Sequence, residues 1–211
     1  MPVLHSPTGA ALYLTGPAAA EFTVLMLPGG GETSSRRMRI WHPGLLRVLA
    51  LAGSLTRRLP EVAVAVLRYS IDGWHTDGSE VIADARWALG RVPAGRLLVI
   101  GHSLGGRVAL RLGDAAGGVV GLAPWVVDHD PVEQLAGRAV RVAVGGRDRV
   151  CPPGPTLEHL GRAVAAGAQV QANMLPGLGH TMIRGAGTWR RWTVDVVRQL
   201  MTREEHTPSS R

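Results

Sequence analysis

The chain of 211 residues has no lysine and a single cysteine, Cys151. No disulfide can therefore form within the chain, and nothing in the sequence indicates an oxidising compartment. No apolar run approaches the ~18 residues that a membrane span requires, and the amino terminus lacks the basic segment and apolar core of a signal peptide. We expect a soluble, cytoplasmic protein without a membrane partner.

Because lysine is absent, all 23 basic residues are arginine, and the formal net charge is +7. A positive charge of this kind can indicate a nucleic-acid-binding protein. The arginines are scattered, however, and form no run of five or six, which is typical of a solvated surface. No composition break or long linker divides the sequence. We expect one domain over residues 1–211 with no nucleic-acid partner, and the oligomeric state is left open.

Short apolar runs alternate with amphipathic segments along the chain. We expect strands at residues 10–14, 22–27, 62–67, 97–100, 119–122, 140–144 and 170–175. Helices are expected from about residue 43 to before Pro60 and from an N-cap at Asp77 to Pro93. Three more are expected after the glycines at 105–106, around residues 157–164 and over residues 187–201. A polar tail is expected from about residue 203. This alternation predicts an α/β fold with a mostly parallel sheet and helices on both faces. Ligands of such sheets bind at the carboxyl ends of the strands.

The segment Gly101-His102-Ser103-Leu104-Gly105 joins the strand expected at 97–100 to a segment that can continue as a helix. Reversing the chain in so few residues requires a strained backbone at Ser103 and no side chains two residues before and after it. Gly101 and Gly105 meet this requirement. The pattern is the G-x-S-x-G nucleophile elbow, which exposes a serine hydroxyl at the end of a strand. Ser103 is therefore the candidate nucleophile.

A serine hydroxyl is a weak nucleophile at neutral pH, so it needs a base and an acid that orients the base. Among the eight histidines, His180 follows the last expected strand on a glycine-bearing loop that can bring its imidazole over the elbow. Asp148 follows the strand expected at 140–144, so the order Ser, Asp, His is the order that this elbow predicts. Asp128 and Asp130, after the preceding strand, are the alternatives for the acid.

No catalytic role is assigned to the other histidines. His102 lies inside the elbow and is expected to point away from the serine hydroxyl. Three histidines lie in loops that are expected near the site, at positions 42, 75 and 129. Three more are expected at the surface, at positions 5, 159 and 206.

Acyl transfer also needs two hydrogen-bond donors for the developing oxyanion. The N–H of Leu104, the residue after the nucleophile, is one candidate. The other is expected from Pro28-Gly29-Gly30-Gly31, where the absence of side chains lets backbone N–H groups face the site. Gly30 is the first choice and Gly31 the second. A phosphate-binding loop is the competing interpretation of these glycines, but no Gly-Lys-Ser/Thr follows them.

From roughly residue 20 to residue 200, these motifs and their order resemble those of an α/β-hydrolase, small and without a cap. Pro28-Gly29-Gly30-Gly31 is similar to the His-Gly-Gly-Gly oxyanion loop of esterases, with proline in the place of histidine. The segment around Asp148 resembles the family's Gly-x-x-Asp acid loop. The size resembles the dienelactone hydrolase branch, although that branch's namesake has a cysteine nucleophile. The resemblance implies the α/β-hydrolase fold and a serine hydrolase with no metal or organic cofactor.

Caps in this family usually follow the strand that ends here at Ala123, and only residues 124–139 precede the next expected strand. We therefore expect an open site, bordered by Gly31, Trp74, Trp125 and Met182, although the three large side chains could equally be packing residues. The expected activity is hydrolysis of a small-molecule carboxylic ester through an acyl-enzyme on Ser103. The alternatives are a thioesterase and a catalytically silent α/β-hydrolase scaffold used for binding.

Overall fold

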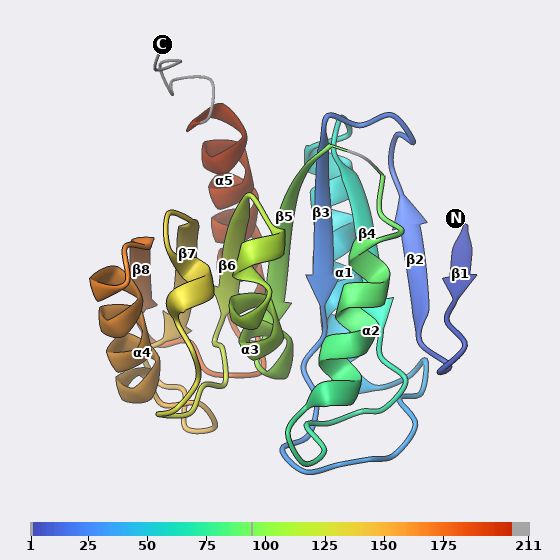
Figure 1. The fold of residues 1–211 in the computed structure, drawn as a ribbon. Helices are drawn as coiled ribbons and strands as arrows, with labels where there is room; N and C mark the ends of the chain where they lie inside the picture. Colours follow the sequence, from blue (N-terminus) through green and yellow to red (C-terminus); the bar gives the residue numbers. More distant parts are fainter. Residues whose placement is uncertain (1, 94, 204–211) are drawn as a thin grey trace.

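The computed structural model describes residues 2–93 and 95–203 of the chain (Figure 1). Within them, eight strands form one sheet in the order β1-β2-β4-β3-β5-β6-β7-β8. They are β1 (Val3–His5), β2 (Ala11–Thr15), β3 (Phe22–Leu27), β4 (Ala63–Arg68), β5 (Arg96–His102), β6 (Gly118–Leu122), β7 (Ala139–Gly145) and β8 (Gln169–Leu175). The pairs β1–β2 and β2–β4 are antiparallel, and the five other pairs are parallel. The prediction of a mostly parallel sheet is confirmed.

The inner strands are buried on both faces of the sheet. Every residue of β3, β4 and β6 is buried, and apart from Thr23 and Arg68 their sequences are apolar for that reason. The edge strand β8 differs, because all its residues are exposed or half-buried. Apolar runs therefore predict the inner strands best.

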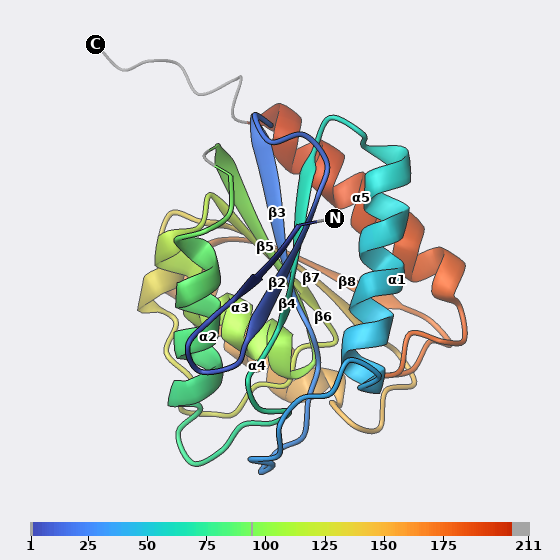
Figure 2. The same ribbon diagram turned by 90° about the vertical axis from the view of Figure 1, so that its right-hand side faces the viewer.

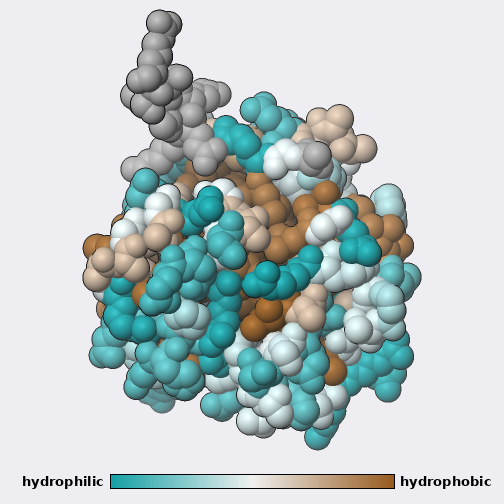
Figure 3. Space-filling model, in the orientation of Figure 1, coloured by the Kyte–Doolittle hydropathy of each residue, from teal (hydrophilic) through white to brown (hydrophobic). Residues whose placement is uncertain are grey.

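Helices cover both faces of the sheet, as Figure 2 shows. On one face lie α1 (Pro43–Arg58) and α5 (Ala186–Arg203), and on the other lie α2 (Ser79–Leu89), α3 (Leu104–Arg111) and α4 (Pro153–Ala165). Two short 3₁₀ helices, η1 (Gly113–Ala115) and η2 (Glu133–Leu135), complete the described elements. Figure 3 shows apolar residues in the middle of the face that carries α2, α3 and α4, with hydrophilic residues around them. The helices thus bury one apolar stripe each against the sheet.

Some element ends differ from the predictions. The strand β1 was not predicted, because its three residues are exposed and depend on pairing with β2. Helix α2 begins after Gly78, which has a φ of 75°, and not after Asp77. The Asp77 carboxylate instead accepts a hydrogen bond from the N–H of Ser79. Helix α5 extends to Arg203, and residues 204–211, on which the expectation of a polar tail falls, lie outside the described residues.

The segment between β6 and β7 contains only η2, so no cap domain is inserted there, as predicted. None of the described helices has the length and apolar character needed to cross a membrane.

The carboxyl ends of the parallel strands meet at one edge of the sheet, the lower edge in Figure 1. Leu27, the last residue of β3, is paired with Gly101 of β5, and Gly145 of β7 is paired with Leu175 of β8. The glycine loop, the elbow, the acid loop and the histidine loop follow these four strands. Strand register therefore brings four segments that are far apart in sequence to one edge.

Candidate active site

The elbow has the strained backbone that the sequence predicts. Ser103 has a φ of 53° and a ψ of −118°, values that a non-glycine residue rarely adopts. A Cβ at Gly101 would collide with the carbonyl group of Gly105, and a Cβ at Gly105 would collide with that of Leu27. Glycine is therefore required at both positions for the chain to turn this closely.

Backbone hydrogen bonds hold the strained residue in place. The N–H of Ser103 donates to the carbonyl of Leu122 over 3.0 Å. The carbonyl of Ser103 accepts from two N–H groups, those of Arg107 and Trp125, each over 3.1 Å. These hydrogen bonds connect the backbone of Ser103 to β6, to the helix that follows it and to the loop after β6.

Three of the predicted site residues come together at this edge. The imidazole Nε2 of His180 lies 2.9 Å from the hydroxyl oxygen of Ser103. On its other side, Nδ1 of His180 lies 2.9 Å from Oδ2 of Asp148. An ionised carboxylate can only accept, so Nδ1 carries the hydrogen and Nε2 is left to accept from the hydroxyl. Ser103 and Asp148 are both buried. This arrangement can move a proton from a hydroxyl to an imidazole.

The Asp148 carboxylate is held ionised by its surroundings. Burial by itself would raise its pKa, but the hydrogen bond with His180 and the N–H groups of Cys151 and Val150 outweigh burial, so the pKa lies below its ordinary value. Oδ1 accepts from those two N–H groups, over 2.8 Å and 2.9 Å. One carboxylate oxygen therefore fixes the acid loop while the other orients the imidazole.

Cys151 lies next to the site, a position that the sequence analysis did not predict. Its side chain is buried, and burial, with the charge of Asp148 as a further cause, raises the pKa of the thiol to about 12. The thiolate is the nucleophilic form of cysteine, so this thiol is unreactive near neutral pH. Ser103 therefore stays the candidate nucleophile.

His102 has a contact that the sequence analysis did not foresee. Its ring is buried, and Nε2 donates over 2.9 Å to the backbone carbonyl of His180. Burial lowers the pKa of His102 to about 4, so the ring is neutral and carries its hydrogen on Nε2. The other nitrogen, Nδ1, is buried without a hydrogen-bond partner among the described residues. His102 thus tethers the loop that carries the candidate base.

The backbone of the glycine loop distinguishes Gly30 from Gly31. The N–H of Gly31 already donates over 2.7 Å to the carbonyl of Asp72. Gly30 is pressed between that carbonyl and the side chain of Leu104, where a Cβ would not fit. Leu104 is the first residue of α3, a position whose N–H has no partner within the helix. The two N–H groups best suited to an oxyanion are those of Gly30 and Leu104.

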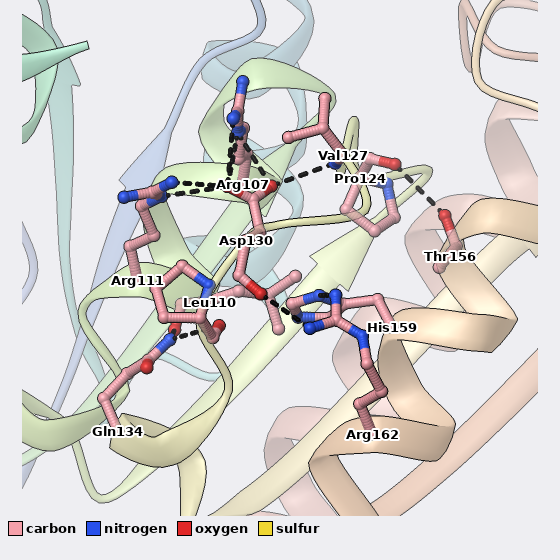
Figure 4. A network of polar contacts seen from close by, with 11 residues as sticks. Arg107, Leu110, Arg111, Pro124, Val127, Asp130, Gln134, Thr156, His159 and Arg162 are labelled. Carbon is pink, nitrogen blue, oxygen red and sulfur yellow. Dashed lines mark hydrogen bonds and ion pairs between the residues drawn. The ribbon is translucent and has the colours of Figure 1, made fainter. Parts of the chain in front are cut away.

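The two alternative acids lie in different environments, and Figure 4 shows the polar contacts of Asp130. Asp128 is exposed, whereas Asp130 is buried. Asp130 pairs with Arg107 over 2.8 Å and also with Arg111, and it accepts from the N–H of Val127 over 3.0 Å. Burial would raise its pKa, but these partners lower it below its ordinary value. Asp130 therefore anchors α3 and the loop after β6.

The expected pocket walls have contacts of their own. Trp74 and Trp125 meet edge to face, with ring centroids 6.0 Å apart. The guanidinium of Arg107 lies over both rings, 3.8 Å from the centroid of Trp74 and 4.6 Å from that of Trp125. Met182 is buried with a φ of 58° and lines an apolar cavity of about 330 Å³ between α1 and α5. Gly31 is exposed at the end of the loop formed by residues 28–31. A contact of these four with substrate stays a prediction.

Three other histidines that the structure describes contact residues outside the candidate site or are buried. His42 accepts from the N–H of Gly44 at the start of α1, and His75 lies 3.0 Å from a carboxylate oxygen of Glu80. His159 was expected at the surface, which is wrong, because it is on the inner side of α4 and is buried. His206 lies outside the described residues. Within the described part of the chain, no group of histidine, cysteine and acidic side chains could hold a metal ion.

Comparison with known proteins identifies the fold. No protein-family model matches the sequence, and no curated protein matches it either. Solved structures do match. The chain is similar to a lidless α/β serine hydrolase from Xanthomonas campestris, with 19% identity, 99% of this chain and 95% of that chain covered, and a TM-score of 0.66. It is similar to an α/β serine hydrolase homologue from Coxiella burnetii, with 15% identity, coverage of 92% and 94%, and a TM-score of 0.68.

A third similar structure is a butyrate-bound thermophilic esterase from Thermogutta terrifontis, with 15% identity, coverage of 96% and 92%, and a TM-score of 0.69. At these identities the likeness concerns the fold. The chain has the α/β-hydrolase fold, without a cap.

Proposed function

We propose that this chain, with its capless α/β-hydrolase fold, is a serine hydrolase that cleaves a carboxylic ester through an acyl-enzyme on Ser103. The observation that carries the proposal is the continuous chain of two 2.9 Å contacts from Ser103 through His180 to Asp148. The neighbours in fold that are described as serine hydrolases or esterases support the same reaction class. The substrate is a small molecule, and its ester carbonyl carbon is the atom that Ser103 attacks.

Acylation begins with the hydroxyl of Ser103. As its oxygen attacks the carbonyl carbon, Nε2 of His180 takes the proton, and the ionised Asp148 stabilises the resulting imidazolium through Nδ1–H. The tetrahedral intermediate then collapses, and the alcohol leaves with the proton that His180 returns. The acyl group remains on the serine oxygen.

Deacylation repeats these roles with water as the nucleophile. His180 removes a proton from the water as it attacks the acyl-enzyme, and the second tetrahedral intermediate expels the serine oxygen, which takes the proton back. The carboxylic acid leaves and Ser103 is regenerated. The groups that transfer protons and stabilise charge in these steps are side chains and backbone N–H groups of this chain.

The oxyanion of both intermediates is assigned to the N–H groups of Gly30 and Leu104. Leu104 is buried and Gly30 is half-buried but closely packed against Leu104 and the carbonyl of Asp72, so neither donor has to reorganise as charge develops. Losing one such donor typically costs about 2.7–4 kcal/mol of transition-state stabilisation. The glycine loop therefore matters to the rate and not only to chain packing.

Covalent labelling with a fluorophosphonate probe tests this proposal. Mass spectrometry of the wild-type protein should find the phosphonyl group on Ser103. The Ser103→Ala variant should take up none, and His180→Ala should be labelled far more slowly because the hydroxyl then lacks its base. A folded wild-type protein that resists the probe would instead be a catalytically silent scaffold.

A further inference from the structure

Three arginines on the loop between β3 and α1 line one cavity of about 460 Å³. They are Arg36, Arg37 and Arg39, and all three are exposed. The same cavity, called here the arginine cavity, is also lined by Trp41 and Asp72. Arg37 also lines a second cavity, and its guanidinium lies beside Gly9, 3.6 Å from where a Cβ would be. A concave site lined by arginines is suited to anionic oxygens, because each guanidinium can bind such a group with two parallel hydrogen bonds.

The arginine cavity adjoins the proposed oxyanion loop on two sides. Its wall includes Asp72, whose carbonyl accepts from the N–H of Gly31 over 2.7 Å. It also includes Pro43, which directly precedes Gly44, and Gly44 lies so close to the carbonyl of Gly29 that a Cβ would collide with it. Gly29 in turn lies beside Ser103, because a Cβ at Gly29 would be 3.2 Å from the Cβ of Ser103. The arginine cavity and Ser103 are therefore neighbours of the same loop.

The loop presents the arginines from an anchored backbone. Met38, in the middle of the loop, is buried, and its N–H donates to the carbonyl of Ser70 over 3.2 Å. Its own carbonyl accepts from Nη1 of Arg68 over 2.8 Å. Arg37 and Arg39, on either side of Met38, are exposed, so this anchored backbone carries both at the surface.

The guanidinium groups are available for a ligand. Among the described residues, none of the three takes part in an ion pair, and Arg39 only lies 5.9 Å from the ring centroid of Trp41. Asp72 is the one carboxylate in the described lining, and its buried Oδ1 has no hydrogen-bond partner among the described residues.

We propose that the arginine cavity binds a carboxylate or phosphate group of the substrate, so that the enzyme prefers an anionic ester or thioester to a neutral one. This inference rests on the function proposed for Ser103. Trp41 is 65% exposed, and its ring offers a flat apolar surface to the carbon chain that joins the charged group to the ester.

Two pairs of substrates distinguish the two sources of charge. Mono-p-nitrophenyl adipate carries a carboxylate that p-nitrophenyl hexanoate of the same acyl length lacks. Acetyl-coenzyme A carries phosphates that S-acetyl-N-acetylcysteamine lacks. In at least one pair, kcat/KM should be about tenfold or more higher for the anionic member. A tenfold difference corresponds to the free energy of about one charge-assisted hydrogen bond. The triple variant Arg36→Ala/Arg37→Ala/Arg39→Ala should lose that preference and hydrolyse the neutral member within about twofold of wild type.

A matched control removes the same number of charges elsewhere. The triple variant Arg57→Ala/Arg58→Ala/Arg91→Ala, at the far end of α1 and after α2, should keep the preference for the anionic member. An equal loss in both triple variants, or no preference in either substrate pair, would overturn the proposal. Association with anionic lipid vesicles without any preference for the soluble anions would also overturn it.

Binding without catalysis separates this inference from the proposed function. With the Ser103→Ala variant, titration calorimetry with coenzyme A or adipate should show binding that the arginine triple substitution abolishes. If neutral esters are hydrolysed but neither anion binds, the arginine cavity inference fails and the serine hydrolase stands. If both anions bind but Ser103 of the wild type is never labelled, the proposed function fails on its own.

Discussion

At the scale of single residues, His102 shows how a side chain beside the nucleophile can act on the base. Its Nε2–H donates to the carbonyl of His180, so it positions the backbone of the residue whose imidazole faces Ser103. The sequence could not reveal this contact, because its two partners are 78 positions apart. The nucleophile elbow, in contrast, is a local pattern that one short segment contains completely.

Two substitutions at His102 separate the hydrogen bond from other effects of the ring. His102→Gln keeps a donor near the position of Nε2, and kcat for a simple ester should stay within about threefold of wild type. His102→Leu removes the donor and leaves a buried carbonyl unpaired, a loss of about 1–3 kcal/mol, and kcat should fall about tenfold or more. Steady-state kinetics should show this loss in kcat with KM little changed, which a purely structural role would not produce.

The lowered pKa of His102 predicts how the free energy of unfolding depends on pH. Folded His102 takes up a proton only near its lowered pKa of about 4, whereas the unfolded chain takes it up near 6.5. The unfolded state therefore binds more protons between these values, and wild-type stability is lost as the pH falls through this window. Urea unfolding at pH 7.5 and 4.5 should show a loss of roughly 2–3 kcal/mol that His102→Gln does not share. An identical acid loss in wild type and His102→Gln would contradict the buried neutral ring.

At the scale of elements, the apolar periodicity predicted the helices and the parallel strands to within a few residues, because each buries its own stripe or run. It missed β1, which depends on pairing with β2, and the burial of His159, which depends on how α4 packs. The sequence placed Trp74 and Trp125 near strand ends but gave no sign that both rings stack on Arg107. Contacts between distant elements are what local patterns omit.

The ion pair beneath α3 should be important for stability. Asp130→Asn removes the charge that balances Arg107 and Arg111, and leaving a buried charge unpaired typically costs about 3–5 kcal/mol. The pKa of Asp130 is lower in the folded state than in the unfolded chain, so its ionised carboxylate stabilises the fold fully above about pH 4. This stabilisation is lost as the pH falls below that value. Urea unfolding at pH 7 should show the full loss, and the difference from wild type should shrink in acid.

Asp128→Asn is the matched control for that measurement. Asp128 is exposed, so its substitution should change stability by less than about 0.5 kcal/mol. A full-length Asp130→Asn protein that stays as stable as wild type but loses its esterase activity would instead identify Asp130 as the catalytic acid.

At the scale of the whole molecule, the absence of a cap limits how much of a substrate can be buried. Each CH₂ group that leaves water contributes about 0.8 kcal/mol, or roughly fourfold in kcat/KM when it is used in the transition state. Without a cap, the gain in kcat/KM per added CH₂ group should stop after a few acyl carbons. Across p-nitrophenyl esters, kcat/KM should peak between about two and six acyl carbons, with no jump in activity when micelles form.

Trp125→Ala tests whether that side chain is a wall of the substrate pocket. If Trp125 contacts the acyl chain, the peak should flatten; if it only packs against Arg107, the melting temperature should fall and the profile should keep its shape. Activity that still rises at twelve or sixteen carbons would require a covered acyl tunnel.

The central claim is that Ser103, His180 and Asp148 act as one catalytic unit, and kcat for a simple ester in single and double variants tests it most directly. Ser103→Ala and His180→Ala should each lower kcat by about 10⁴-fold or more, and the double variant should lose little further, because neither residue works without the other. Asp148→Asn should cost about 10⁴-fold by leaving the imidazole in the wrong tautomer. Losses from the Ser103 and His180 substitutions that multiply in the double variant would contradict the claim.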